Sequence, residues 1–529
     1  MSGKLRCPFP GCTGEFEDKA DSPDLLICPE PACRRLSVRC DRTQGGDRCR
    51  ALNRPLARFC RLCRQLLPSD AVSAAWLREQ GLETLDSGRG VDVLGPDLVA
   101  SLEGKVRTNA SSRVMLEMGE AAGRIWIGAG DGTFSLVEPF ATGQPPIMER
   151  NLWPGRGNLR VRAISSAIWL LIYCEHGVEV LDLLQFDDQK HGIHRTTPTK
   201  LWSSQGEQRL VAEPVLLPCH RGAADSVEGL DRVAIWVTAG SGGLFLRTAH
   251  LSIARKGEPI VEVMQLDSPA PEPGERPELL SVPVGIVNEA VLCLPRDIVR
   301  IALRAMADGG SQRVEAKCHS LPGSVEIVQR RQGRFVTGAL ERGGVAFVPS
   351  SPSARSSGDS AGSLWVAVQF PDSGAREILY RIGYGDAADM HPVQDSGLPL
   401  GVETFSGNGR VLCFTGNSLR LYNALGQITM RAESPHLAGL RRATIAGRIA
   451  VCSGQNISSG QSRWFTVLAN LVGSPSLFGL NISDDPLPHP VVLGSYLFSI
   501  ERNPQASADA SYGKNGAYRL VGRPLGTRG

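Results

Sequence analysis

Cysteine spacing constrains the first part of this chain more than any other feature. Eight of the 14 cysteines lie in the first 63 of 529 residues, and the other six are spread over the remaining 466. No apolar leader precedes them, and cysteines clustered without a secretory signal are more typical of metal ligands than of disulfides. The eight are Cys7, Cys12, Cys28, Cys33, Cys40, Cys49, Cys60 and Cys63.

The spacing sorts these cysteines into two consecutive sets of four. The first set consists of two C-P-x-P-x-C segments, at 7–12 and 28–33, and the second set ends in a C-x-x-C pair at 60–63. Zn²⁺ takes four tetrahedral ligands, and a short proline-containing loop lets both thiolates of a pair reach one ion. We therefore predict two structural zinc ions, one in each set. An interleaved pairing, and buried or redox thiols without metal, are the alternatives.

The stretch 49–63 resembles double zinc ribbons, which often carry an N-x-P-x-A-x-F-C segment and a closing C-x-x-C. The matching residues are Asn53, Pro55, Ala57, Phe59 and Cys60. Two departures are eight residues between Cys40 and Cys49, where two are usual, and Arg64, where glycine is usual. The resemblance covers about the first 60 residues and implies closed sites of four cysteines with no open position for a substrate.

Arginine is concentrated in the same part of the chain. Residues 34–64 contain ten arginines and two aspartates, and the guanidinium fork suits phosphate or carboxylate groups. An acidic protein surface, a nucleic acid and a solvated face that offsets thiolate charge are three open interpretations. Phe59 is the only aromatic residue among them, and the whole chain prefers arginine, with 49 Arg to 8 Lys. The candidate anion or partner contacts are Arg50, Arg54, Arg58 and Arg61.

Residues 91–529 carry a repeated strand pattern. Apolar runs of four to eight residues are broken by Gly, Pro, Asn and Asp, and successive units begin at spacings that average 54 residues. That period fits a four-stranded propeller blade. Runs such as Ile-Trp-Ile and Val-Leu-Cys-Phe do not alternate, as expected for strands buried on both faces. The units begin near residues 124, 167, 232, 288, 344, 410 and 448.

We therefore predict a mainly β protein in three parts. They are a double zinc ribbon over 1–66, a short helix and linker over 67–90, and a β-propeller over 91–529. Seven blades fit best within a range of six to eight, and two separate β domains are the alternative. The hairpins at 125–136 and 411–426 are similar to those of quinoprotein-like and WD-repeat-like propellers, although the Trp-Asp dipeptide of WD blades is absent.

The sequence carries little that points to a reaction. No phosphate-binding loop, nucleophile elbow or zinc-protease helix motif occurs. Adjacent Cys-His pairs point to opposite faces of a strand and form no local dyad. The remaining candidates are a weak divalent-ion group (Asp187, Asp188, His191, His194), two Cys-His pairs (Cys219–His220, Cys318–His319) and four thiols in apolar runs (Cys174, Cys293, Cys413, Cys452).

These observations favour a non-enzymatic, zinc-binding adaptor or scaffold. Its propeller and its basic ribbon arm would bind protein partners, in the cytoplasm, with no membrane segment and no identified small-molecule substrate. One alternative is nucleic-acid or ribonucleoprotein binding through the arginine-rich ribbon. The other is a propeller enzyme with its active site at the mouth of the central channel.

Overall fold

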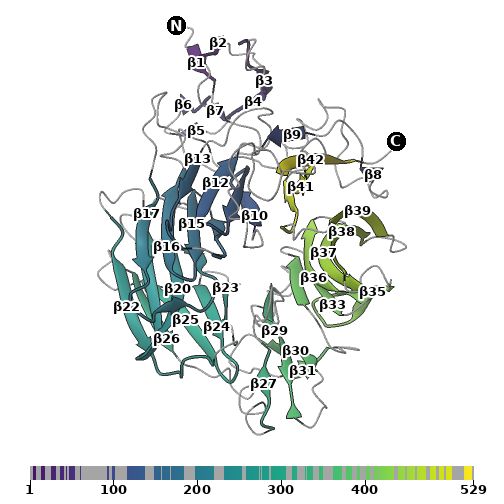
Figure 1. The fold of residues 1–529 in the computed structure, drawn as a ribbon. Coiled ribbons are helices and arrows are strands. Elements are labelled where there is room, and N and C mark those ends of the chain that lie inside the picture. Colours follow the sequence, from purple (N-terminus) through teal and green to yellow (C-terminus); the bar gives the residue numbers. More distant parts are fainter. Residues whose placement is uncertain are drawn as a thin grey trace. The chain divides into compact units, whose positions relative to one another are not determined.

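The computed structural model is built from β-strands (Figure 1). It forms two compact units, Met1–Ile172 with Glu179–Lys200 and Pro490–Gly529, and Tyr173–Val178 with Leu201–His489. The structure describes residues 4–7, 13–17, 25–30, 36–40, 43–44, 47–53, 60, 92–93, 98–101, 116–137, 148–156, 158–166, 168–183, 197–219, 231–252, 258–272, 275, 277–284, 287–305, 312–317, 328, 331–336, 345–349, 362–371, 377–383, 390–393, 401–405, 410–415, 418–433, 439–446, 449–458, 461–471, 477–483, 488–493, 496–502 and 518–526.

Short antiparallel strands form the cysteine-rich head. They pair as a β1-β2 hairpin, a β3-β4-β7 sheet and a β5-β6 hairpin. Four of these strands, β1, β3, β4 and β6, end directly before a cysteine, so the strands fix where those thiols lie. The strands are β1 (Lys4–Arg6), β2 (Glu15–Glu17), β3 (Leu25–Ile27), β4 (Leu36–Arg39), β5 (Thr43–Gln44), β6 (Asp47–Arg48) and β7 (Leu52–Asn53).

Beyond the head, three sheets of the described chain belong wholly or partly to the first unit, and the first two follow a simple up-and-down order. The first is β10 (Leu116–Ala121), β11 (Arg124–Ala129), β12 (Thr133–Val137) and β13 (Met148–Asn151). The second is β14 (Arg162–Ser166), β15 (Trp169–Cys174), β16 (Gly177–Asp182) and β17 (Thr199–Ser203). The last combines β40 (Val491–Leu493), β41 (Tyr496–Arg502) and β42 (Tyr518–Gly526) with β8 (Asp92–Val93) and β9 (Leu98–Ser101).

Five further sheets form the second unit. Strands β18 (Arg209–Leu210), β19 (Val215–Pro218), β20 (Arg232–Gly240), β21 (Gly243–Leu251) and β22 (Val261–Leu266) form one, and β23 (Glu278–Val284), β24 (Val287–Cys293), β25 (Ile298–Ala305) and β26 (Gln312–Lys317) the next. The third is β27 (Arg334–Phe335), β28 (Val345–Pro349), β29 (Gly362–Gln369), β30 (Glu377–Gly383) and β31 (Met390–Pro392). The last two are β32 (Gly401–Phe405), β33 (Arg410–Thr415), β34 (Ser418–Tyr422) and β35 (Ile428–Glu433), then β36 (Leu440–Ala446), β37 (Ile449–Ser458), β38 (Gln461–Asn470) and β39 (Leu477–Ser483).

Strand β24 shows how these sheets are held together. Its side chains alternate between two cores: Ala290 and Leu292 pack with Ile235 of β20, whereas Val291 and Cys293 pack on the opposite side. That second core also contains Leu364, Val366 and Val368 of β29. Because successive residues of a strand point to opposite faces, one apolar run supplies two cores at once.

The same arrangement continues along the second unit. On β29, Leu364 and Val366 lie in the core shared with β24. Trp365, which lies between them in the sequence, packs on the other face with Val411 and Cys413 of β33. On β33, Leu412 then packs with Ala450 and Cys452 of β37. The prediction of strands buried on both faces is confirmed, and the fold is mainly β, built from small antiparallel sheets like propeller blades.

The described residues form eight such sheets after residue 91, one more than the seven blades that fit the sequence best. The difference comes from the last sheet. Strand β9 pairs with β42 in a register that joins Ser101 to Arg519 and Leu98 to Gly522. A sheet shared by two distant segments gives no complete repeat in the sequence, so counting repeats misses it.

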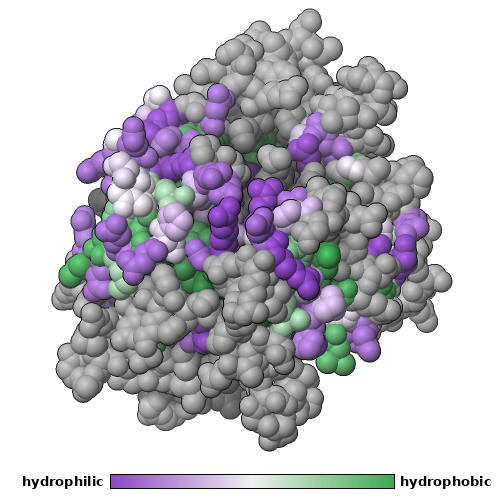
Figure 2. Space-filling view, turned by 90° about the horizontal axis from the view of Figure 1, so that it is seen from below, coloured by the Kyte–Doolittle hydropathy of each residue, from purple (hydrophilic) through white to green (hydrophobic). Residues whose placement is uncertain are grey.

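Figure 2 shows one face of the molecule, on which hydrophilic residues outnumber hydrophobic ones in the described part of the surface. Within the described ranges, the exposed large hydrophobic residues are Ile260, Val263 and Leu425. No helix in the described part of the chain is long and apolar enough to span a membrane.

Three predicted features lie outside the described residues: the helix at 71–80, the linker that follows it and the candidate metal-binding group at 187–194.

Replacing Leu292 or Leu364 by alanine tests the stacked cores. Both side chains are fully buried, in two different cores, so each change is expected to lower the free energy of unfolding by about 2–5 kcal/mol. Leu425→Ala is the matched control, because that leucine is 68% exposed and its loss should change stability by less than about 0.5 kcal/mol. Urea denaturation followed by tryptophan fluorescence measures all three, and equal effects would contradict the assignment.

Candidate metal centre

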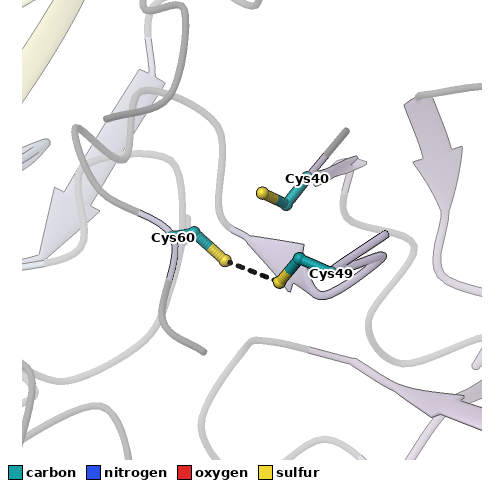
Figure 3. Close-up of side chains that lie close together, drawn as sticks. All are labelled: Cys40, Cys49 and Cys60. Atoms are coloured by element: carbon teal, nitrogen blue, oxygen red, sulfur yellow. Dashed lines mark hydrogen bonds between the residues drawn. The ribbon is translucent and has the colours of Figure 1, made fainter. Parts of the chain in front are cut away.

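Three thiols of the head meet at one point. The Sγ atoms of Cys40, Cys49 and Cys60 all lie within 4.8 Å of one another, and those of Cys49 and Cys60 are 3.6 Å apart. Figure 3 shows the three side chains facing one another. Cys40 and Cys60 are fully buried and Cys49 is half-buried.

The backbone around Cys40 explains how residues so far apart in the sequence converge. The Cys40 amide donates to the carbonyl of Ala51 (2.9 Å), and the Arg50 amide donates to the carbonyl of Cys40 (3.1 Å). Arg50 has a φ of 51°, the left-handed conformation that reverses the chain next to Cys49. The intervening residues form the β5-β6 hairpin. The long gap between Cys40 and Cys49 is therefore accommodated by an inserted hairpin, and the two cysteines still lie side by side.

The separation of the thiols fits a metal ion. With Zn–S bonds of about 2.3 Å, the sulfur atoms of a tetrahedral site lie about 3.8 Å apart. The 3.6 Å between Cys49 and Cys60 is close to that edge, and the other pairs stay within 4.8 Å. An all-thiolate donor set selects Zn²⁺ or another soft ion over Mg²⁺ or Ca²⁺. The cluster can hold one metal, whereas Cys63, its predicted fourth ligand, lies outside the described residues.

Asn53 supports this cluster without being a ligand. Its side chain is 2% exposed, and its Nδ2 group donates to the Ala51 carbonyl (3.0 Å) and to Cys60 Sγ (3.6 Å). A donor aimed at a ligand sulfur orients that sulfur and stabilises its charged form. The sequence pattern had marked Asn53 by position alone, and the structure gives that position a physical role.

The first four cysteines are only partly described. Cys7 and Cys28 are buried in one small cluster with Phe16 and Leu52. The Cys7 amide donates to the Gly14 carbonyl (2.9 Å) and so extends the β1-β2 hairpin, and Cys28 directly follows β3. Cys12 and Cys33 lie outside the described residues, so a second metal site stays a prediction.

The predicted arginine contacts are likewise untested. Arg50 is half-buried beside the thiol cluster, and Arg54, Arg58 and Arg61 lie outside the described residues.

Cysteines of the body behave as core groups. Cys293, Cys413 and Cys452 are buried, and burial raises the pKa of Cys452 to about 12 and the pKa values of the other two well above the ordinary thiol range. Burial, with a smaller contribution from Asp231, raises the pKa of Cys219 to about 12. These thiols stay protonated at neutral pH and are poor nucleophiles. His220 and the pair Cys318–His319 lie outside the described residues.

One polar arrangement in the body was not predicted. His489 lies between two hydroxyl groups, with Nδ1 at 2.6 Å from Ser453 Oγ and Nε2 at 2.9 Å from Thr444 Oγ1. No motif marks these residues, because they are brought together from β36, β37 and the segment before β40. The two hydrogen bonds hold the imidazole ring between β36 and β37.

The sequence matches no protein-family model and no curated protein. Solved structures similar to this chain include Sqt1 from Saccharomyces cerevisiae, with 10% identity over 83% of this chain and 100% of that one and a TM-score of 0.46. Sqt1 from Chaetomium thermophilum has 11% identity over 81% and 98%, with a TM-score of 0.44. The WD40 domain of SCAP from fission yeast has 7% identity over 81% and 98%, with a TM-score of 0.33. Because these TM-scores are all below 0.5, the description of the fold rests on the sheets of this chain and not on the likenesses.

Replacing Asn53 by alanine tests the support of the thiol cluster. Losing the donor to Cys60 Sγ is expected to lower zinc affinity about 10- to 100-fold, measured by competition with a chromophoric chelator. Asn151→Ala is the control, because the Asn151 side chain bonds the Asp131 carbonyl in the body. Circular dichroism at saturating zinc checks that the head still folds, and unchanged affinity in a folded variant would show that Asn53 does not act on the metal site.

Proposed function

We propose that this protein is a non-enzymatic, zinc-binding scaffold that binds protein partners through its blade-like sheets and its basic head. The observation that carries the proposal is the cluster of Cys40, Cys49 and Cys60. With Cys63 as fourth ligand the ion has no open position, so it stabilises the head and does not activate water or substrate. Two thiolate-only sites would make the head a rigid arm.

The second zinc ion in this proposal is held by Cys7, Cys12, Cys28 and Cys33. The burial of Cys7 and Cys28 in one cluster supports it, because two repeated knuckles must approach each other to complete a site. Zinc thiolate sites need reduced cysteines, so we infer a cytoplasmic location.

Protein partners are the favoured ligands for two reasons. The stacked cores of the second unit hold its sheets rigidly, which suits recognition of another folded or extended chain. The arginines of the head suit acidic groups on such a partner. Nucleic acid is the competing ligand, and the partner experiment below separates the two.

Metal analysis tests the zinc proposal. The purified chain is expected to carry about two zinc ions, and Cys60→Ser should lower that content toward one. Cys219→Ser is the matched control, because this half-buried thiol lies in the body and should leave the zinc content unchanged. A full chain that binds no zinc, or a Cys60 variant that keeps both ions, would overturn the assignment.

Affinity purification of the full chain tests the scaffold proposal. A specific protein should be recovered in near-equimolar amount and should survive nuclease treatment. Recovery that disappears with nuclease would instead support the nucleic-acid alternative, whereas salt weakens charged contacts to either kind of partner. Recovery of no stoichiometric protein under cross-linking would contradict the scaffold function.

A further inference from the structure

Strand β22 combines three properties that point to a docking edge. It is the outermost strand of its sheet, in the order β18-β20-β21-β22, and in the described part of the chain it pairs with β21 alone. Ile260, directly before the strand, and Val263, within it, are 68% and 53% exposed. They are two of the three large hydrophobic residues that the described surface exposes to this degree.

The inner side of β22 is firmly held. Six residue pairs join it to β21, from Val261 opposite Ala249 to Leu266 opposite Leu244. Leu266 is buried in the core shared with β20 and β24, and Met264 packs against that core. The Gln265 side chain donates to the Gly242 carbonyl (2.8 Å). The strand is therefore already extended, and a partner would bind it without the cost of ordering it.

Charge selects the partner. The segment 258–267 contains three acidic residues, all exposed, and no basic residue: Glu258, Glu262 and Asp267. Arg247 of β21 lies opposite Val263, but its guanidinium donates to Thr238 Oγ1 (3.0 Å) and Gln208 Oε1 (3.3 Å). Pairing with a second copy would set three carboxylates against three more, and like charges on adjacent strands are unfavourable.

Strand β35 shows what a protected outer edge looks like in the same unit. It is also the last strand of its sheet, but its exposed positions are polar, and Arg431 pairs with Glu433 (2.6 Å). Charged residues of both signs discourage the addition of a further strand. Strand β22 lacks such a balanced pair and exposes apolar side chains.

We propose that β22 is the docking edge for an extended, basic segment of a partner protein. This inference rests on the proposed scaffold function and names one of its contact sites. The partner adds as a strand beside β22, its backbone bonding the open edge. Successive side chains of the added strand alternate between the two faces. Its basic side chains lie near Glu262 and Glu258 on one face, and its apolar side chains cover Val263 on the other.

A peptide of alternating lysine and valine is the probe. It is expected to bind the full chain saturably and to slow amide hydrogen exchange in 260–266 while leaving 428–433 unchanged. Two matched peptides separate strand addition from simple attraction: one alternates glutamate and valine, and the other keeps the lysines but has a central proline. Equal binding of the proline peptide would overturn the proposal, because proline cannot continue the hydrogen-bonded pairing.

Variants locate the site. Glu262→Lys, and Ile260→Ser combined with Val263→Ser, should each weaken the alternating peptide about tenfold or more, through charge reversal and loss of apolar contact. Thr429→Lys places the same charge on the exposed edge of β35 and should have no effect beyond a small general repulsion. Glu262, Ile260 and Val263 are exposed, so thermal unfolding of their variants should be unchanged. Thr429→Lys loses the hydrogen bond from Thr429 Oγ1 to the Leu421 carbonyl (3.0 Å) and should unfold at a slightly lower temperature. Equal weakening by Thr429→Lys would mean that the peptide senses net charge only.

The outcome is separable from that of the scaffold proposal. If the full chain recovers a protein partner but the β22 variants recover it equally and the peptide does not bind, the docking edge is wrong and the scaffold function stands. If the peptide binds at β22 while the full chain recovers no partner, the edge accepts basic strands but the scaffold function fails. Failure of both tests overturns both.

Discussion

The structure of the body depends on strands that supply two cores at once. In β24, Leu292 faces one neighbouring sheet and Val291 the other, and the middle strands β29 and β33 repeat the arrangement. A four-stranded antiparallel sheet of this size cannot cover both of its own faces. Each sheet of the second unit is therefore stable only while its neighbours are in place, and stability is shared along the stack.

The head follows a different principle. In its described residues, two buried clusters contain few hydrophobic side chains apart from the cysteines: Phe16, Leu52 and the partly buried Leu5 in one, and Ala51 in the other. A segment of about 60 residues rarely buries enough apolar surface to fold alone, and a metal or another cross-link adds the missing stability. Since thiolates gathered within 4.8 Å repel one another without a cation, metal binding and folding of the head are expected to be a single event.

Features set by residues close together in the sequence could be predicted, whereas contacts between distant segments could not. The apolar runs that begin near 124, 232 and 288 correspond to β11, β20 and β24. They could be recognised because a strand buried on both faces is apolar at nearly every position. Cysteine spacing likewise brought Cys49 and Cys60 to one site. The β9-β42 pairing and the contact of His489 with Ser453 depend on distant chain segments that no short pattern links. Asn53 lies between these cases, since a motif marked it but only geometry showed its donor aimed at Cys60 Sγ.

Stacking also decides where recognition can occur. When the faces of a sheet are used to hold its neighbours, the turns and the outermost strand are what it can offer to another molecule. Most outer edges must then be protected, since an open strand invites unwanted pairing, and the Arg431–Glu433 pair of β35 does this. Strand β22 differs, because its carboxylates would repel those of a second copy while its apolar side chains remain exposed to a partner. A one-signed charge on an exposed edge thus prevents self-association and favours one class of partner through the same residues.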